Sequence, residues 1–309
     1  MESRFSSRWS SGPRAYDRSF GRVNGTLIAQ IVTSGLVTGL IYMLIALGVT
    51  LLFGIMRVVN FVHGELVMLS AFAVYYLGSA AGLPFFLALP GAILISAMLA
   101  VFCQYALFKP LQYEILNCFI VGIGASFAIR SASWAIFGPE PIAIPATFPG
   151  VLNVGGVFIA KQRLFAAALC VALAVLLYLF LHYTKPGKAM RAVEQDREAA
   201  LLMGISVERV YLSAFVISAI LAAVGGTMLG SLFGVDPEMG AEPLLKSFII
   251  VQIGGMGSIA GTVIAGLFIG LSDSITGTLL GGELAFIIDF AILMLILIIR
   301  PRGLFGYDV

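Results

Sequence analysis

The sequence predicts an all-α membrane protein, a polytopic bundle of about eight apolar segments, some of them broken or re-entrant. Hydrophobic residues make up 60% of the chain and charged residues only 11%, whereas a soluble domain carries about 25% charge. Several apolar runs also exceed the roughly 18 residues that a membrane-spanning helix needs. A membrane β-barrel is not expected, because its strands would give short alternating segments.

Composition gives no sign of a cofactor, a metal site or a nucleic-acid partner. The net charge is only +2. Cys103, Cys118 and Cys170 lie in or beside apolar runs, without metal-ligand spacing or a disulfide framework. The two histidines, His63 and His182, are not spaced as metal ligands.

Residues 1–24 are rich in serine and arginine and contain only two acidic residues. They are interpreted as a basic tail held on the cytoplasmic side, with a transit peptide as the alternative. The remaining residues, 25–306, form the predicted transmembrane domain.

The apolar segments are separated by proline, glycine and charged residues, which end helices. They are predicted at about 27–53, 58–77, 85–108, 116–137, 164–183, 211–233, 244–271 and 283–299. The loop at 138–163 contains few basic residues, which favours the outer side, whereas loop 184–210 is richer in lysine and arginine, which favours the cytoplasm.

The number of segments conflicts with this charge distribution. Five simple spans before loop 184–210 would place the N-terminus outside, although its arginines favour the inside. Either the segment at 27–53 contains a second short piece that crosses or re-enters, or the basic tail is an exception.

A short amphipathic helix is predicted inside loop 184–210. Asp196 is a suitable N-cap for a helix over 197–203, and Gly204 suits the position after its end. Ala199, Leu202 and Met203 share one face of that helix. Such a face either docks on a partner protein or lies on the lipid surface, and the residues alone do not distinguish these uses.

Polar residues interrupt the apolar pattern at Asn60, His63 and Glu65, and Gly64 lies between the last two. They are interpreted either as a polar cluster facing a pathway or an interface, or as groups at the membrane surface. Arg130, inside the fourth segment, either extends to the surface or pairs within the bundle.

Glycines mark two further features. Gly226, Gly230 and Gly234 recur every fourth residue, which predicts close packing of helix backbones. Gly254, Gly255 and Gly257 break the seventh segment. This break predicts two half-helices or a short re-entrant piece before a full span, with a packing seam as the alternative.

Several short runs together resemble the permeases of the branched-chain amino-acid ABC importer family, and the match is closest to the LivH-type membrane subunit. The runs are LIYMLIALG at 40–48, NFVHGE at 60–65, EAA with a glycine at 198–204, GGMGSIAG at 254–261 and RPRGLFG at 300–306. They cover nearly all of residues 25–306 and follow the order and spacing of the family.

This resemblance implies an ATP-driven importer in the bacterial inner membrane for branched-chain or other small amino acids. It implies two separate ATPase subunits, a second permease subunit and a periplasmic solute-binding protein as partners, besides membrane lipid. The loop residues expected to couple to the ATPases are Glu198, Ala199, Ala200, Leu202, Met203 and Gly204. Pathway or interface residues are expected among Asn60, His63, Gly64, Glu65, Gly254, Gly255 and Gly257.

The chain is not expected to be an enzyme, because it shows no catalytic constellation and no GxxxxGK[ST] phosphate loop. ATP hydrolysis would then occur on another chain. The alternative is a stand-alone secondary transporter or channel that uses Asn60, His63, Glu65, Arg130 or Asp289 as ion-linked groups. A membrane-embedded enzyme is a more distant possibility.

Overall fold

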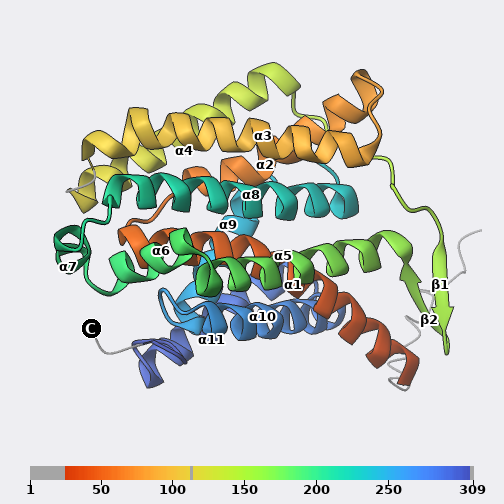
Figure 1. Ribbon diagram of the computed structural model, residues 1–309. Coiled ribbons are helices and arrows are strands. Elements are labelled where there is room, and N and C mark those ends of the chain that lie inside the picture. Colours follow the sequence, from red (N-terminus) through yellow and green to blue (C-terminus); the bar gives the residue numbers. More distant parts are fainter. Residues whose placement is uncertain (1–24, 112–113, 307–309) are drawn as a thin grey trace, which may run out of the picture.

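The computed structural model describes residues 25–111 and 114–306, and the predicted basic tail at 1–24 lies outside this range. The predicted all-α bundle is confirmed, with its long helices running side by side (Figure 1). The helices are α1 (Gly25–Met56), α2 (Val62–Tyr75), α3 (Phe85–Cys103), α4 (Ile115–Phe137), α5 (Lys161–Tyr183), α6 (Lys185–Gln195), α7 (Arg197–Leu202), α8 (Val207–Phe233), α9 (Ala241–Gly254), α10 (Ile259–Leu279) and α11 (Gly282–Ile299).

Seven helices in the described part of the chain are long and apolar enough to cross a membrane. They are α1, α4, α5, α8, α10, α11 and α3 with its continuation through a π-helical turn, η2 (Gln104–Phe108), and a 3₁₀ turn, η3 (Lys109–Leu111). The most apolar windows of α1 and α8 are 78% and 72% buried, whereas those of α4 and α11 are each 17% buried. Thus α1 and α8 form the centre of the bundle, and α4 and α11 lie at its periphery.

Two apolar segments give helices of only 14 residues each, α2 and α9. A π-helical turn, η1 (Tyr76–Ala80), follows α2 directly. The break after Gly254 separates α9 from the 21-residue α10, so the seventh segment is a short piece followed by a full span.

Two elements were not predicted from the sequence. The loop at 138–163 contains a hairpin of β1 (Val151–Val154) and β2 (Val157–Ala160), and α6 occupies the first part of loop 184–210. Gln30 in α1 anchors the hairpin, because its side-chain amide donates to the Phe158 carbonyl at 2.9 Å and accepts from the Phe158 N–H at 3.0 Å.

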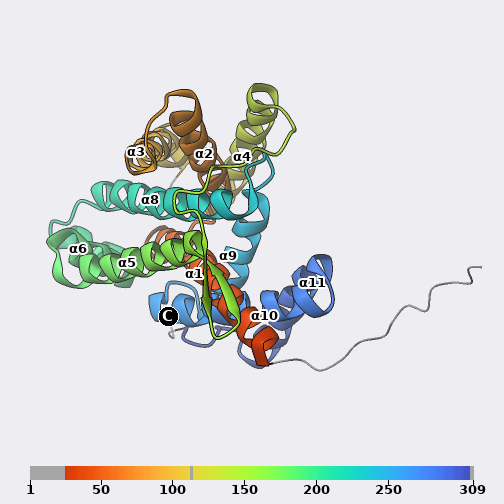
Figure 2. The same cartoon turned by 90° about the vertical axis from the view of Figure 1, so that its right-hand side faces the viewer.

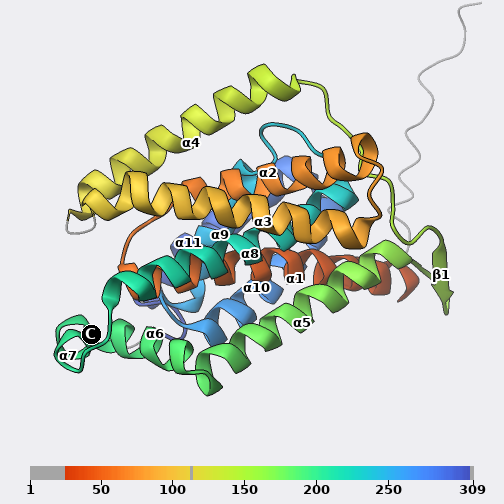
Figure 3. The ribbon, with the colours of Figure 1, turned by 45° about the horizontal axis from the view of Figure 1, so that its top comes forward.

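Glycines bring the central helices into direct contact, because they leave no side chain between the backbones. A Cβ on Gly270 of α10 would lie 2.1 Å from the Cα of Gly39 in α1. A Cβ on Gly226 of α8 would lie 2.1 Å from the Val67 carbonyl oxygen of α2. Figure 3 shows α1 and α8 inside the bundle, with α4 and α5 at opposite edges.

The helix α1 runs through the bundle in one direction, from one end to the other. This helix is unbroken over 32 residues, so it contains no second short piece. Its first turns contact the hairpin, and Gly54 near its end contacts Glu194 of α6. Gly25 and the hairpin therefore lie at one end of the bundle and α7 at the other (Figure 1).

The last described residues return to the broken seventh segment. The N–H groups of Leu304 and Phe305 donate to the carbonyls of Ile253 and Gly254, at 2.8 and 3.1 Å. These carbonyls belong to the last turn of α9, where no N–H group of the same helix is left to donate to them. The C-terminal segment thus completes the hydrogen bonding of α9.

Candidate functional site

The short helix α7 has the local structure that the sequence predicts. The Asp196 Oδ1 accepts hydrogen bonds from the N–H groups of Glu198 and Ala199, at 2.9 and 3.0 Å. Gly204 follows the helix at a φ of +79°, a conformation that favours glycine. The cap and the glycine therefore fix both ends of a helix of only six residues.

Apolar side chains of α7 point into solvent or toward a partner. Leu202 and Met203 are 89% and 82% exposed, and Glu198 and Ala199 are also exposed. Ala200 is buried, so among the predicted coupling residues it supports α7 from inside and does not contribute to the outer surface.

The helix α6 connects α7 to the core of the bundle. Thr184 caps its start by accepting a hydrogen bond from the Gly187 N–H at 3.1 Å. One face, with Met190 and Val193, is buried. The opposite end of α6 carries Glu194, which packs against Gly54 of α1 and Gly257 of the break before α10.

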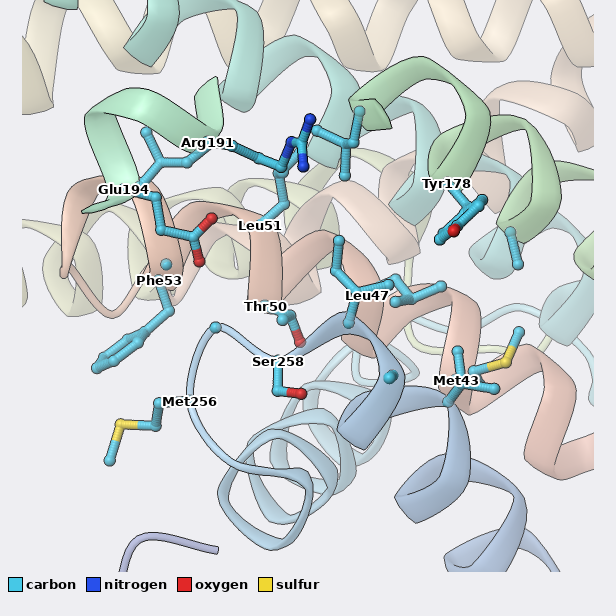
Figure 4. Close-up of a pocket in the computed structure, with 18 of the residues that line it drawn as sticks. Met43, Leu47, Thr50, Leu51, Phe53, Tyr178, Arg191, Glu194, Met256 and Ser258 are labelled. Atoms are coloured by element: carbon cyan, nitrogen blue, oxygen red, sulfur yellow. The ribbon is translucent and has the colours of Figure 1, made fainter. Parts of the chain in front are cut away.

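A groove of about 1430 Å³ opens along α1, α5, α6 and α10 (Figure 4). Its walls are mainly apolar and include Met43, Leu47, Leu51, Val171 and Val175. The hydroxyl oxygens of Thr50 and Thr262 are 2.7 Å apart, so one hydroxyl donates to the other, which in turn donates to a carbonyl of its own helix. Most of the groove therefore offers an apolar surface.

Charged side chains gather at the α6 end of the groove. They belong to Arg57, Arg191, Glu194 and Arg302. Burial raises the pKa of the Glu194 carboxyl above its ordinary value, and the nearby Arg191 guanidinium partly offsets this shift. Arg191 and Glu194 could not be predicted as groove residues, because they are part of a charged run that resembles an ordinary loop.

The predicted polar cluster is buried and internally bonded. The Glu65 Oε1 accepts from Arg130 at 2.6 Å and from Ser126 at 2.7 Å. The His63 Nε2 lies 3.0 Å from the Ile45 carbonyl oxygen, and its Nδ1 lies 3.0 Å from the Ser218 hydroxyl. Arg130 thus pairs within the bundle.

The other predicted pathway or interface residues lie at helix contacts. The Asn60 Oδ1 accepts from the Val62 N–H at 3.0 Å. Gly64 lies against Gly240, Gly254 against Gly261, and Gly255 against Gly306. Of the seven predicted residues, Gly257 lines the large groove.

A second charged cluster lies beside α9. Lys246 is buried and forms ion pairs with Asp273 at 2.7 Å and with Glu242 at 3.0 Å. It lines a cavity of about 520 Å³ with residues of α1, α8 and α10. The signal for this cluster in the sequence is Lys246, a lone lysine within an apolar run.

Figure 2 shows the bundle from the hairpin end, with α9 between the α2–α8 and α10–α11 parts of the molecule. Among residues 25–111 and 114–306, no three histidine, cysteine, aspartate or glutamate side chains are grouped closely enough to hold a metal ion.

Comparison with known proteins gives consistent matches over most of the chain. Residues 31–297 match the family model described as "Branched-chain amino acid transport system / permease component". The chain is 32% identical to the high-affinity branched-chain amino acid transport system permease protein LivH of Escherichia coli K12, over 86% of this chain and 91% of that protein. It is 30% identical, over the same shares, to the permease protein BraD of Pseudomonas aeruginosa.

A solved structure, PsaBC from Streptococcus pneumoniae in complex with Fab, matches with a TM-score of 0.48 and 13% identity, over 92% of this chain and 95% of that one. The family model and the LivH and BraD relatives each cover more than four-fifths of the chain. The chain therefore belongs to the family of branched-chain amino acid transport system permease components.

Proposed function

We propose that this chain is a permease subunit of an ATP-driven importer for branched-chain or other small amino acids, located in the bacterial inner membrane. The observation that carries the proposal is the apolar surface of Leu202 and Met203 at one end of the bundle, on a helix held rigid by Asp196. An exposed apolar face on a short capped helix is suited to a cleft in a partner protein.

The partner at this surface is an ATPase subunit, and a complete importer contains two of them. Glu198, Ala199, Leu202 and Met203 contact the ATPase, Ala200 supports the helix from below, and Gly204 ends it. Closure of the ATPases moves α7, and α6 transmits the movement to α1 and to the break before α10 through Glu194. This chain then performs transport, and the chemistry of ATP hydrolysis belongs to the partner.

The solute path follows the groove along α1, α5 and α10. Because the groove is open on one side, a second permease subunit, a paralogue of this chain, completes its wall. Gly257 contributes to the path, whereas Asn60, His63, Gly64, Glu65, Gly254 and Gly255 serve helix packing beside it. A periplasmic solute-binding protein delivers the amino acid at the hairpin end.

The proposal is tested by purifying the chain from its native host in mild detergent and identifying the proteins that co-purify by mass spectrometry. ATPase subunits are expected with the wild type and absent with Glu198→Arg or Gly204→Trp. The matched control is Lys188→Gln, which removes an exposed charge on the neighbouring helix α6.

The opposite result would favour a stand-alone transporter. If the wild type carries no ATPase, yet moves amino acid into vesicles when reconstituted alone, the importer proposal is wrong. The ion-linked groups considered for that alternative, such as Glu65 and Arg130, are bonded to each other inside the bundle, which does not favour it.

A further inference from the structure

Arg191 has a charged group whose bonding is incomplete. It lies on α6 and lines the α6 end of the groove. Its Nε is buried and has no hydrogen-bond partner in the described part of the chain. Arg191 as a whole is only partly buried, so the terminal N–H groups of its guanidinium are the donors that a ligand in the groove can reach.

Glu194 places an opposite charge beside this guanidinium. Residues three apart on a helix lie on the same face, so Arg191 and Glu194 are neighbours on α6. Figure 4 shows both side chains directed into the groove, with Thr50 and Ser258 across from them. The Glu194 carboxylate rests on Gly54 and Gly257, where the absence of side chains leaves it accessible from the groove.

Directly next to this charge pair the groove becomes apolar. Leu47 and Leu51 of α1 form one wall, and Val171 and Val175 of α5 form the other. A small molecule that matches this surface therefore carries a negative and a positive group close together, and an aliphatic chain beside them.

We infer that Arg191 and Glu194, with the adjoining apolar walls, form a binding site for an aliphatic α-amino acid. The guanidinium of Arg191 binds the carboxylate, the carboxylate of Glu194 binds the ammonium group, and the side chain lies against Leu47 and Leu51. This inference rests on the proposed function, since it places a site on the proposed path at the end that faces the ATPases.

The test measures binding of radiolabelled L-leucine to the purified transporter complex in lipid nanodiscs, without solute-binding protein. Two competitors each lack one charge: 4-methylpentanoate has no ammonium group, and 3-methylbutylamine has no carboxylate. For the wild type, leucine is expected to bind about tenfold more tightly than either competitor, because each charged contact adds to affinity.

Two variants separate the roles of the two charges. In Arg191→Gln, the affinity for leucine is expected to fall about tenfold, to that of 3-methylbutylamine for the wild type. In Glu194→Gln, the affinity for leucine is expected to fall to that of 4-methylpentanoate for the wild type. Lys188→Gln, which removes an exposed charge from the same helix, keeps the wild-type order.

Size-exclusion chromatography and co-purifying ATPase show whether each variant is assembled, and Arg191→Met and Glu194→Met, which also remove the charge, replace any variant that is not. Absence of leucine binding to the wild type at millimolar concentration overturns the site, as does unchanged leucine affinity in both charge variants. Uptake with solute-binding protein is measured in parallel. If the wild type imports leucine while the site fails, only this inference is wrong. If it imports no amino acid, the proposed function is wrong as well.

Discussion

Glu65 and Arg130 join a central helix to a peripheral one. Glu65 in α2 is fully buried, and Arg130 comes from α4, whose most apolar window is only 17% buried. The carboxylate accepts from both Arg130 and Ser126 through the same oxygen, Oε1, so Arg130 is the charge that compensates it there. Removal of one partner from a buried ion pair is far more costly than removal of both, because the remaining charge has no compensation.

Arg130→Met is therefore expected to destabilise the protein by about 3 kcal/mol. The double variant with Glu65→Gln should recover much of this loss. Thermal unfolding in detergent measures both, and Lys188→Met, at an exposed position, is the control. A double variant less stable than Arg130→Met alone would show that the two side chains do not act as a pair.

Glu194 makes stability depend on pH. Because burial raises its pKa in the folded state, the folded protein binds this proton more readily than the unfolded chain does. The resulting stabilisation is complete below the unfolded pKa of about 4.3 and is lost as the pH rises through the folded pKa. The other titratable or charged groups that line the groove near Glu194 are Arg57, His182, Arg191 and Arg302.

Glu194→Gln should therefore gain stability relative to the wild type as the pH rises from about 4 to about 8. Melting temperatures of the two proteins over this range measure the difference. Lys188→Gln should follow the wild type at each pH, since it leaves the groove intact. A constant difference between Glu194→Gln and the wild type would contradict the predicted proton linkage.

At the scale of elements, glycine contacts set the distance between the central helices. At Gly226 of α8, an added Cβ would meet the Val67 carbonyl oxygen of α2, which belongs to the backbone and cannot rotate away. A larger residue there must separate the two helices along their length. Gly124 in α4 differs, because a Cβ built on it meets no atom within 4 Å.

Gly226→Val is expected to cost roughly 3 kcal/mol, at the upper end for overpacking, because the clash is with backbone. Gly124→Ala, in an open helical position, should be neutral or stabilise by up to about 1 kcal/mol. Thermal unfolding of the two variants compares them directly. Equal melting temperatures would show that α2 and α8 do not pack as closely as described.

Sequence reasoning predicted the elements whose cause is local. Long apolar runs gave the long helices, and the Asp196 cap and Gly204 gave α7. It did not predict α6, because a proline next to a glycine, as at Pro186 and Gly187, usually ends a helix, although proline in the first turn starts this one. It also did not predict the groove, since Arg191 and Glu194 acquire their role only when α6 packs beside α1 and α10.

For the whole molecule, the direction of α1 determines how the start of this helix and α7 are placed on the two sides of the membrane. The start of α1 contacts the hairpin, and α7 lies at the opposite end of the bundle (Figure 1). If α7 faces the cytoplasm, the arginine-rich residues 1–24 begin on the outer side, against the usual charge rule. The charge rule therefore conflicts with the single pass of α1, because it predicts that both loop 184–210 and the N-terminus lie inside.

Cysteine labelling distinguishes the two topologies. Cys103, Cys118 and Cys170 are all buried, so they give little background. In spheroplasts, a membrane-impermeant maleimide should label Thr26→Cys and Val154→Cys directly and Leu202→Cys only after the membrane is opened. If Thr26→Cys instead behaves like Leu202→Cys, the path of α1 across the membrane is wrong.

The hydrogen bonds from Leu304 and Phe305 to the end of α9 also have a consequence for biosynthesis. The carbonyls of Ile253 and Gly254 receive their partners from residues that the ribosome adds about fifty positions later. Until Leu304 and Phe305 have been added and have left the ribosome, these acceptors remain without their final donors, and unpaired carbonyls are costly inside a membrane. The seventh segment thus reaches its final structure only after residues 304 and 305 reach it, whereas α1 to α8 can assemble earlier.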